Sequence, residues 1–244
     1  MRQPRANPMR VLVIQNDRTE GLGLYEEYLE EKQIERRVLH AYRLGTDESF
    51  PPIEEFDAFI VGPTPISAND TNRHPFLAKE WEYLGEVIGS EKPCLGVCCG
   101  GQMLARRLGA RVVRSPEKEV GGYEVRLTED GSRDPLFAGF PREFPVFHWH
   151  SDMFEVPPGG RLLAEGDPCP IQAFGWGKVR GVIFHLEIDS SEAERWTDAY
   201  PAELDAVGKA RQQVLEECSE REPEMGRLAH RLMENFLGLS QIDR

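Results

Sequence analysis

Residues 92–102, KPCLGVCCGGQ, hold three cysteines within six positions inside a glycine cluster, and a cysteine thiolate is a strong nucleophile. A strand-to-helix turn of the form Gly-x-nucleophile-x-Gly lifts one side chain into the open, because its glycines leave room for a strained backbone. The run from Gly96 to Gly100 fits this form with Cys98 at its centre. Centring the turn on Cys99 would place the branched side chain of Val97 where a glycine is needed. The spacing therefore favours Cys98 as the nucleophile.

The neighbours of Cys98 suit this assignment. The backbone N–H of Cys99 can help to bind an oxyanion, and the helix expected after the turn directs its positive end at the sulfur, which favours the thiolate. Cys94, on the preceding strand, is interpreted as a small core residue. The turn taken alone also fits a tight glycine loop with buried, unreactive cysteines, so further groups are needed to support catalysis.

A cysteine nucleophile usually works with a histidine that a carboxylate or amide orients. Residues 181–187, GVIFHLE, form an apolar run of strand type that ends in His185, with Glu187 two positions later. Side chains at i and i+2 of an extended chain project to the same side, so Glu187 can face the same pocket as His185. A histidine at a strand end is more often structural, but the nearby carboxylate and the cysteine turn favour a catalytic role.

The other histidines offer a second interpretation, a metal site. His148 and His150, in VFHWHSD, could combine with His185 and Glu187, but there is no H-E-x-x-H helix and no matching cysteine spacing. The sequence therefore predicts no metal site. His40, His74 and His230, which lack such a context, are interpreted as surface or structural residues.

Composition narrows the class of protein. The 244 residues are 40% hydrophobic and 29% charged, as in a folded globular domain, and carry a formal charge of −13, which argues against a nucleic-acid-binding surface. The apolar run that follows the arginines of the N-terminus is too short for a signal peptide or a membrane span. Five cysteines without paired spacings indicate free thiols. We expect a cytoplasmic protein that does not bind membranes.

Hydrophobic patterning predicts alternating strands and helices in the first half of the chain. This order is typical of a doubly wound α/β sheet, in which ligand sites lie beyond the carboxyl ends of the strands. The glycine breaks at Gly62 and at 96–101 would both fall at that edge. The expected strands are 11–14, 37–39, 56–61 and 94–97, and the expected helices are 25–33, 76–88 and 100–108.

The rest of the chain changes character. Residues 111–183 contain short strand-like stretches separated by turns, which indicates an antiparallel or mixed extension of the same sheet. The expected strands here are 111–114, 123–127, 146–150, 171–174 and 179–184. After Asp189 the chain turns helical, and apolar residues between 225 and 237 repeat at the spacing of one helix face. That face is expected to pack on the domain or on a second copy of the chain.

Two motifs together resemble a known family. GVCCGGQ at 96–102 and FHLE at 184–187 are similar to the G-x-C-x-G-x-Q and F-H-P-E motifs of the class I glutamine amidotransferases. Four further stretches follow that family's order: VGP at 61–63, KEVGGY at 118–123, FHWHSD at 147–152 and QAF at 172–174. Within the family, the chain is most similar to stand-alone chains like the glutaminase domain of GMP synthase.

The resemblance implies an architecture. The fold would be α/β: a doubly wound, mixed, mainly parallel sheet with flanking helices and flavodoxin-like layering, plus C-terminal helices. Residues 10–190 would form the amidotransferase-like domain, and residues 191–244 a helical extension packed on it. Two departures from the family pattern are Val61, where the family often has a second glycine, and Leu186, which replaces the proline of F-H-P-E.

The resemblance also implies roles for individual residues. Cys98 would be the nucleophile, His185 the general acid and base, and Glu187 the group that holds its tautomer. Gly62 and Cys99 would give backbone N–H groups to the oxyanion. The residues expected to hold the amino-acid end of a glutamyl substrate are Gln102, His150 and Ser151.

The expected chemistry is cleavage of a γ-glutamyl amide through a cysteine thioester, with release of glutamate and ammonia and without a cofactor. The substrate would be glutamine or another γ-glutamyl compound, and both an ammonia-accepting partner protein and a homo-oligomer are compatible with the sequence. One alternative is a γ-glutamyl peptidase acting on a peptide or conjugate. A second is a catalytically silent binding or regulatory module. A third, a thiol stress protein, is disfavoured because such proteins typically have a histidine after the nucleophile, where this chain has Cys99.

Overall fold

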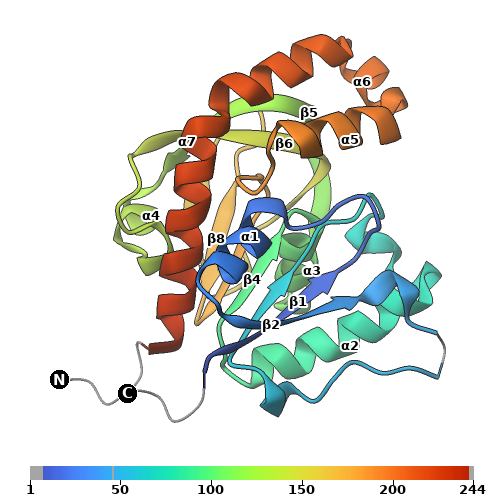
Figure 1. Cartoon of the computed structure of the whole chain (residues 1–244), viewed down its shortest axis with the longest axis vertical. Coiled ribbons are helices and arrows are strands. Elements are labelled where there is room, and N and C mark those ends of the chain that lie inside the picture. Colours follow the sequence, from blue (N-terminus) through green and yellow to red (C-terminus); the bar gives the residue numbers. More distant parts are fainter. Residues whose placement is uncertain (1–7, 46, 242–244) are drawn as a thin grey trace.

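The computed structural model describes residues 8–45 and 47–241, which form one nine-stranded sheet flanked by helices (Figure 1). The strand order is β2-β1-β3-β4-β9-β8-β7-β5-β6, parallel from β2 to β9 and antiparallel from β9 to β6. The strands are β1 (Arg10–Gln15), β2 (Glu35–His40), β3 (Ala58–Val61), β4 (Cys94–Val97), β5 (Val112–Leu127), β6 (Glu143–Phe154), β7 (Arg161–Glu165), β8 (Ala173–Trp176) and β9 (Val179–Val182). The predicted α/β class with a mixed sheet is confirmed.

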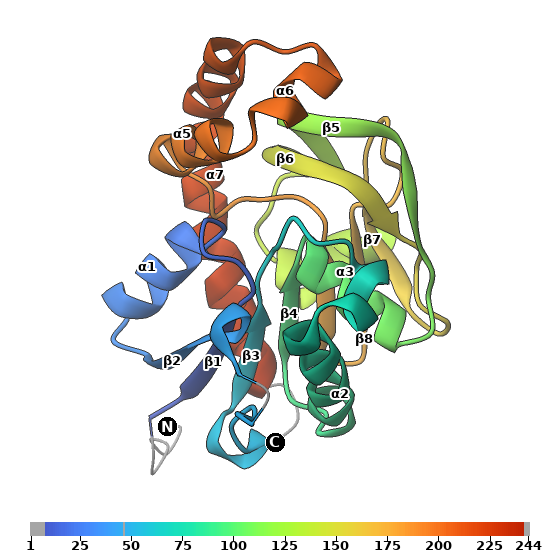
Figure 2. The same cartoon turned by 90° about the vertical axis from the view of Figure 1, so that its right-hand side faces the viewer.

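The helices cover both faces of the sheet: α1 and α7 lie on one side, and α2 and α3 on the other. In Figure 2, α2 and α3 lie in front of the strands and α7 lies behind them. The α-helices are α1 (Gly23–Glu31), α2 (Pro75–Gly89), α3 (Cys99–Arg107), α4 (Glu129–Arg133), α5 (Ser190–Ala199), α6 (Pro201–Val207) and α7 (Arg211–Gly238). Short 3-10 turns lie at Ala41–Arg43, Ile53–Glu55, Ala68–Arg73, Pro135–Phe137 and Leu239–Gln241.

The alternation of side chains along β1 explains why both faces need cover. Val11 and Val13 pack into one apolar cluster with α1 and α7, whereas Leu12 and Ile14 pack into a second cluster with α2 and α3. All four side chains are fully buried. A strand that is apolar on both faces is stable only between two helical layers, and this fixes β1 in the sheet interior.

The antiparallel half differs from the sequence expectation in two ways. The stretches predicted separately at 111–114 and 123–127 are one long strand, β5, and the strand β7 was not predicted. β5 pairs with β6 throughout, but Arg114 lies opposite Asp152 while Glu119 lies opposite His150. The residues 115–118 therefore bulge out of the ladder, and this break hid the continuity of the strand from a periodicity analysis.

The C-terminal helices pack on the domain. α7 runs along the sheet beside α1, and α5 and α6 lie above the ends of β5 and β6 (Figure 1). The predicted helix face is buried within the chain: Met225, Leu228, Leu232 and Phe236 are fully buried. Residues 242–244, the last of the predicted extension, and residues 1–7, which include two of the N-terminal arginines, lie outside the described residues.

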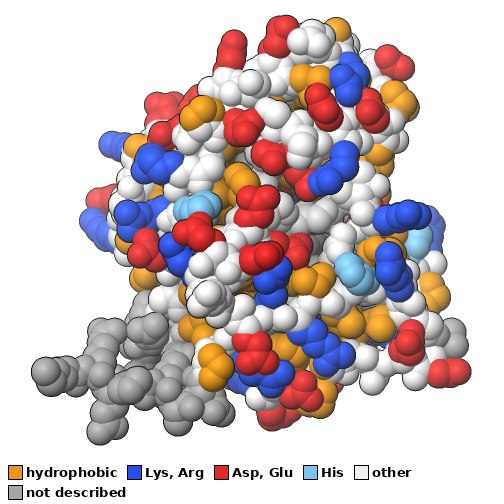
Figure 3. Space-filling model, in the orientation of Figure 1, with side chains coloured by type: hydrophobic (Ala, Val, Ile, Leu, Met, Phe, Trp, Pro, Cys, Tyr) orange, Lys and Arg blue, Asp and Glu red, His pale blue; other side chains and the backbone are white. Residues whose placement is uncertain are grey.

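The surface carries charges of both signs. Figure 3 shows acidic and basic side chains interspersed over the visible face, with hydrophobic side chains scattered among them. Across residues 8–45 and 47–241, no helix combines the length and apolar character needed to cross a membrane.

A buried carboxylic acid lies beneath the loop that follows β3. Glu80 of α2 is fully buried, and its Oε1 accepts a hydrogen bond from Asn16 Nδ2 at 3.0 Å, while the same amide donates to the carbonyl oxygen of Gly62 at 3.2 Å. Burial raises the pKa of Glu80 to about 8, although the Asn16 hydrogen bond opposes this shift. Near neutral pH the acid is therefore largely protonated in the folded chain and ionised in the unfolded one.

Glu80→Gln is expected to remove part of the pH dependence of stability. The folded chain holds the Glu80 proton more tightly than the unfolded chain, in which the pKa of Glu80 is near 4.5. Glu80 therefore contributes its full stabilisation below pH 4.5, and this contribution is lost as the pH rises toward 8. Melting temperatures at pH 4 should match the parent, and at pH 8.5 the variant should melt a few degrees higher. Glu86→Gln, an exposed position on the same helix, serves as the control. Parallel pH curves for parent and Glu80→Gln would contradict this account.

Candidate active site

Cys98 lies at a sharp turn between β4 and α3. Its backbone has φ of 50° and ψ of −112°, a region that residues with a side chain rarely occupy and that costs about 1–3 kcal/mol. The Cys98 N–H donates to the carbonyl oxygen of Val182 at the end of β9, and its carbonyl oxygen accepts from the N–H of Gln102. The neighbouring strand and helix thus hold the strained conformation in place.

The glycines around Cys98 are required because backbone segments approach each other closely there. A Cβ atom on Gly96 would lie 2.6 Å from the carbonyl carbon of Gly100, and one on Gly100 would lie 2.1 Å from the carbonyl oxygen of Val61 in β3. Both distances are shorter than any normal contact. The turn can therefore form only with glycine at these two positions.

The Cys98 sulfur lies in a buried environment with one favourable backbone contact. Burial, followed by the charge of Glu20, raises the pKa of the Cys98 thiol well above its usual range, while a hydrogen bond from the Cys99 N–H opposes the shift. The Cys99 thiol itself donates to the carbonyl oxygen of Ile66 at 3.3 Å and is fully engaged there. The expectation that the helix end makes Cys98 a thiolate is outweighed by burial, so the resting group is the thiol.

His185 and Glu187 form a buried pair three to five residues beyond the end of β9. His185 Nδ1 lies 2.6 Å from Glu187 Oε1, and Glu187 Oε2 accepts the N–H of Leu186 at 3.1 Å. Because a carboxylate only accepts, Nδ1 carries the proton and Nε2 is left as the basic nitrogen. Nε2 makes no hydrogen bond to any described residue. The ring of Trp196 contacts His185 edge-on, with centroids 4.9 Å apart, and fixes its orientation.

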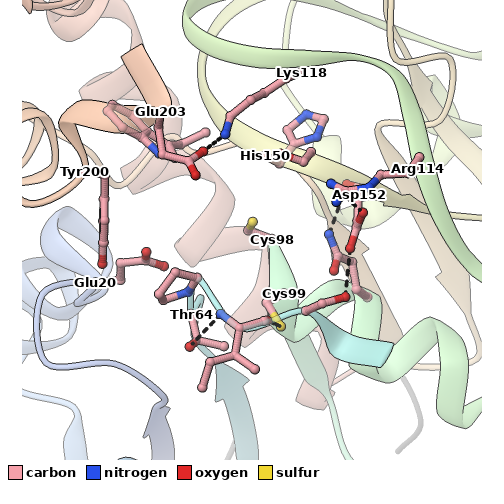
Figure 4. A pocket seen from close by; sticks show the side chains of 16 residues that line it. Glu20, Thr64, Cys98, Cys99, Arg114, Lys118, His150, Asp152, Tyr200 and Glu203 are labelled. Atoms are coloured by element: carbon pink, nitrogen blue, oxygen red, sulfur yellow. Dashed lines mark hydrogen bonds and ion pairs between the residues drawn. The ribbon is translucent and has the colours of Figure 1, made fainter. Parts of the chain in front are cut away.

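A cavity of about 420 Å³ opens beside Cys98 (Figure 4). Five residues singled out from the sequence line it: Cys98, Cys99, Gln102, His150 and Ser151. His185, Glu187 and Gly62 are not among the residues that line it, and the first two are fully buried.

The Gly62 N–H is used within the sheet. It donates to the carbonyl oxygen of Ile14 at 2.9 Å and so extends the β1–β3 ladder by one residue. Donation from Gly62 to an oxyanion would require this hydrogen bond to open, and the role stays a prediction. The Cys99 N–H contacts the Cys98 sulfur, and its role as an oxyanion donor also stays a prediction.

Comparison with known proteins places this site in a family. Residues 26–196 match the family model described as "Glutamine amidotransferase class-I". The chain is 33% identical over 207 residues to the glutamine amidotransferase-like protein YfeJ of Salmonella typhimurium, a match that covers 82% of this chain and 85% of that protein. The chain belongs to the class I glutamine amidotransferase family.

Two further relatives extend the comparison. A crystal structure of a glutamine amidotransferase from Thermotoga maritima is 30% identical, with a TM-score of 0.86, and the match covers 95% of this chain and 99% of that one. One subunit of the glutamine-hydrolysing GMP synthase of Thermococcus kodakarensis is 34% identical over 103 residues. That match covers 41% of this chain and only 53% of the relative.

Within this amidotransferase fold, Gln102 of α3 holds the wall of the cavity that contains Asp152 of β6. Its Nε2 donates to the carbonyl oxygen of Asp152 at 3.1 Å, and the Asp152 carboxylate accepts from Ser67 Oγ at 2.8 Å. Arg114 reaches the same carboxylate at 3.3 Å. These contacts join α3, β5, β6 and the loop after β3 around the cavity.

Sequence reasoning missed the residues that close the far side of the cavity. Tyr200 and Glu203 come from α6 and its N-terminus, and Lys118, in the β5 bulge, pairs with Glu203 across the opening (Figure 4). Glu20 lines the cavity from the loop before α1 and accepts a hydrogen bond from Tyr200. No motif links these positions in sequence, because the C-terminal helices and the bulge meet only in the fold.

Glu20 is an acid held in its neutral form. Burial, and then the nearby charge of Asp17, raises the pKa of Glu20 to about 8, with the Tyr200 hydrogen bond opposing the shift. At neutral pH the Glu20 carboxyl is therefore largely protonated and can donate a hydrogen bond into the cavity. Protonation also removes a negative charge that would disfavour a thiolate at Cys98.

Gly100→Ala is expected to disrupt the turn. The added methyl group would overlap the Val61 carbonyl, which is rigid backbone within the sheet, and overpacking of this kind costs about 1–3 kcal/mol or more. Gly89→Ala is the matched control, since nothing lies within 4 Å of its Cβ position near the end of α2. Urea unfolding should show a clear loss of stability for Gly100→Ala only. Equal stability of the two variants would contradict the steric account.

Proposed function

We propose that this protein hydrolyses a γ-glutamyl amide through a thioester on Cys98, with His185 as general acid and base. The observation that carries the proposal is the strained Cys98 turn, which opens into a cavity and receives the Cys99 N–H at its sulfur. The His185–Glu187 pair at the same edge of the sheet, with Nε2 as the basic nitrogen, supports it. Membership in the class I amidotransferase family gives the reaction class.

The first half of the reaction forms the thioester. His185 Nε2 takes the proton from the Cys98 thiol as the sulfur attacks the side-chain carbonyl carbon, and the carbonyl oxygen becomes an oxyanion near the Cys99 N–H. The carbon–nitrogen bond then breaks, and His185 returns its proton to the leaving amine. Glu187 stabilises the transient imidazolium through the hydrogen bond at Nδ1.

The second half releases the acid. Water enters in place of the amine, His185 removes a proton from it, and the resulting hydroxide attacks the thioester carbonyl. The carbon–sulfur bond breaks, the proton on His185 returns to Cys98, and the γ-carboxylic acid leaves and gives its proton to solvent. Burial raises the pKa of the Cys98 thiol, which favours a step in which proton transfer to His185 accompanies the attack.

The amino-acid end of the substrate is assigned to the wall of the cavity made by Gln102, His150 and Ser151. These residues come from α3 and β6, and the Gln102–Asp152 contact holds the two elements together. The neutral Glu20 carboxyl adds a hydrogen-bond donor on the opposite side. A zwitterionic head group suits a wall that offers donors and acceptors together.

Glutamine is the first substrate we propose, and a larger γ-glutamyl conjugate is the second. The cavity volume of about 420 Å³ falls in the range of sites that hold a whole small molecule, and its outer rim carries the charged pair of Lys118 and Glu203. A leaving group with a charge of its own would fit beside this pair. Trp149 lines the cavity, whereas Phe154 packs in the core against Phe174.

For the ammonia-releasing reaction we propose a partner protein as acceptor. The Thermococcus relative is named as one subunit of GMP synthase, a name that points to an enzyme made of separate chains. The five buried cysteines are all free, which suits a reducing compartment such as the cytoplasm.

The decisive assay measures glutamate released from glutamine and, separately, from a γ-glutamyl dipeptide. The Cys98→Ala protein should lose activity on both substrates by at least about a thousandfold, because the only nucleophile is removed. Cys218→Ala, a buried cysteine of α7 away from the cavity, should retain activity and control for loss of a core thiol.

The relative rates identify the substrate class. Release from glutamine supports the glutaminase assignment, and release only from the dipeptide moves the function to a γ-glutamyl peptidase. Activity that survives in Cys98→Ala would exclude the thioester mechanism. Silence on both substrates, together with no alkylation of Cys98 by a glutamine-like electrophile, would identify a catalytically silent module.

A further inference from the structure

Three buried side chains next to the cavity face one another, and two of them, Glu119 and His148, have no role in the proposed hydrolysis. Glu119 lies on β5, and His148 and His150 lie on β6; their side chains are 0–5% exposed. The strand register sets Glu119 opposite His150 and Gly121 opposite His148, so the two histidines and the carboxylate share one face of the ladder. The β5 bulge at 115–118 creates this register.

The potential ligand atoms converge. His150 Nε2 lies 3.1 Å from Glu119 Oε2, His148 Nε2 lies 3.9 Å from Glu119 Oε1, and the donor atoms of all three residues fall within 4.8 Å of one another. Ligands of a tetrahedral zinc ion, at about 2.0–2.2 Å from the metal, are separated by about 3.4 Å. The observed separations, from 3.1 Å up to 4.8 Å, bracket that value, so the side chains must adjust their positions to bind an ion.

The same atoms have no other partner within the described part of the chain. Both carboxylate oxygens of Glu119 and both ring nitrogens of each histidine make no hydrogen bond, and the 3.1 Å approach lacks hydrogen-bond geometry. A buried polar group without a partner destabilises the fold because it has lost its hydrogen bonds to water. Three such side chains aimed at one point indicate a ligand that satisfies them together.

We propose that Glu119, His148 and His150 bind a divalent first-row transition metal, with zinc as the best match to two imidazoles and one carboxylate. This site differs from the one weighed from sequence, which combined the histidines with His185 and Glu187; those two are engaged with each other. Three protein ligands leave a fourth position for water or another small ligand. His150 also borders the cavity of Cys98, which gives the ion a route from solvent.

The proposal does not depend on hydrolysis, because metal binding is measured directly. The Cys98→Ala chain is used so that the cavity thiol cannot bind the ion. After removal of metals with a chelator, it is titrated with zinc against a competing indicator dye. We expect one equivalent of zinc and a rise in melting temperature on loading.

Matched variants in the same background locate the site. Glu119→Gln and His148→Gln should each weaken zinc binding at least about a hundredfold. Loss of a residue that only supports a metal ligand costs up to about a hundredfold, and loss of a ligand itself should cost at least as much. His230→Gln, a partly exposed histidine on α7, should bind as the parent does. Equal affinity of all the variants, or no stoichiometric binding by the parent, would overturn the proposal.

A second measurement keeps all three proposed ligands unchanged, so it does not depend on whether the ligand variants fold. X-ray absorption at the zinc edge of the loaded Cys98→Ala chain should show nitrogen and oxygen neighbours with imidazole scattering and no sulfur. A sulfur neighbour would place the ion at another cysteine and would contradict the assignment to Glu119, His148 and His150.

Discussion

The close approach of backbone segments at the Cys98 turn is the constraint on which the rest of the site depends. Gly96 packs against the first turn of α3, and Gly100 packs against the Val61 carbonyl of β3, at distances that exclude any side chain. This contact forces Cys98 into its strained conformation and aims the Cys99 N–H at the sulfur. β9 pairs with β4 and ends at Val182, whose carbonyl oxygen accepts the Cys98 N–H. His185 and Glu187, which follow β9, therefore lie near the edge of the sheet that carries the Cys98 turn.

The C-terminal helices complete the cavity. Trp196 of α5 fixes the ring of His185, while Tyr200 and Glu203 form the wall opposite α3. Besides packing on the domain, α5 and α6 therefore orient His185, the proposed base, and close the cavity. The same helices bring Tyr200 to Glu20, and the buried environment they create keeps that carboxyl largely protonated.

Sequence reasoning was most successful where a local pattern has one steric explanation. The spacing of Gly96, Cys98 and Gly100 predicted the turn. The i, i+2 spacing predicted that His185 and Glu187 face the same side, and the family resemblance implied their contact, seen at 2.6 Å. It failed where tertiary contacts decide. The bulge in β5 made one strand look like two in the sequence. The hydrogen bond from the Gly62 N–H to Ile14 was likewise not foreseen from the sequence. The grouping of Glu119 with two histidines depends on strand register, which no local pattern reveals.

The central claim is that Cys98, and not the adjacent Cys99, is the nucleophile. It is tested most directly by incubating the chain with a glutamine analogue that carries a diazoketone in place of the amide, and mapping the label by peptide mass spectrometry. Cys98 faces the cavity, whereas the Cys99 thiol donates to Ile66, so the account predicts one label on Cys98 that excess glutamine suppresses. Labelling of Cys99, or labelling of Cys98 that glutamine does not reduce, would contradict it.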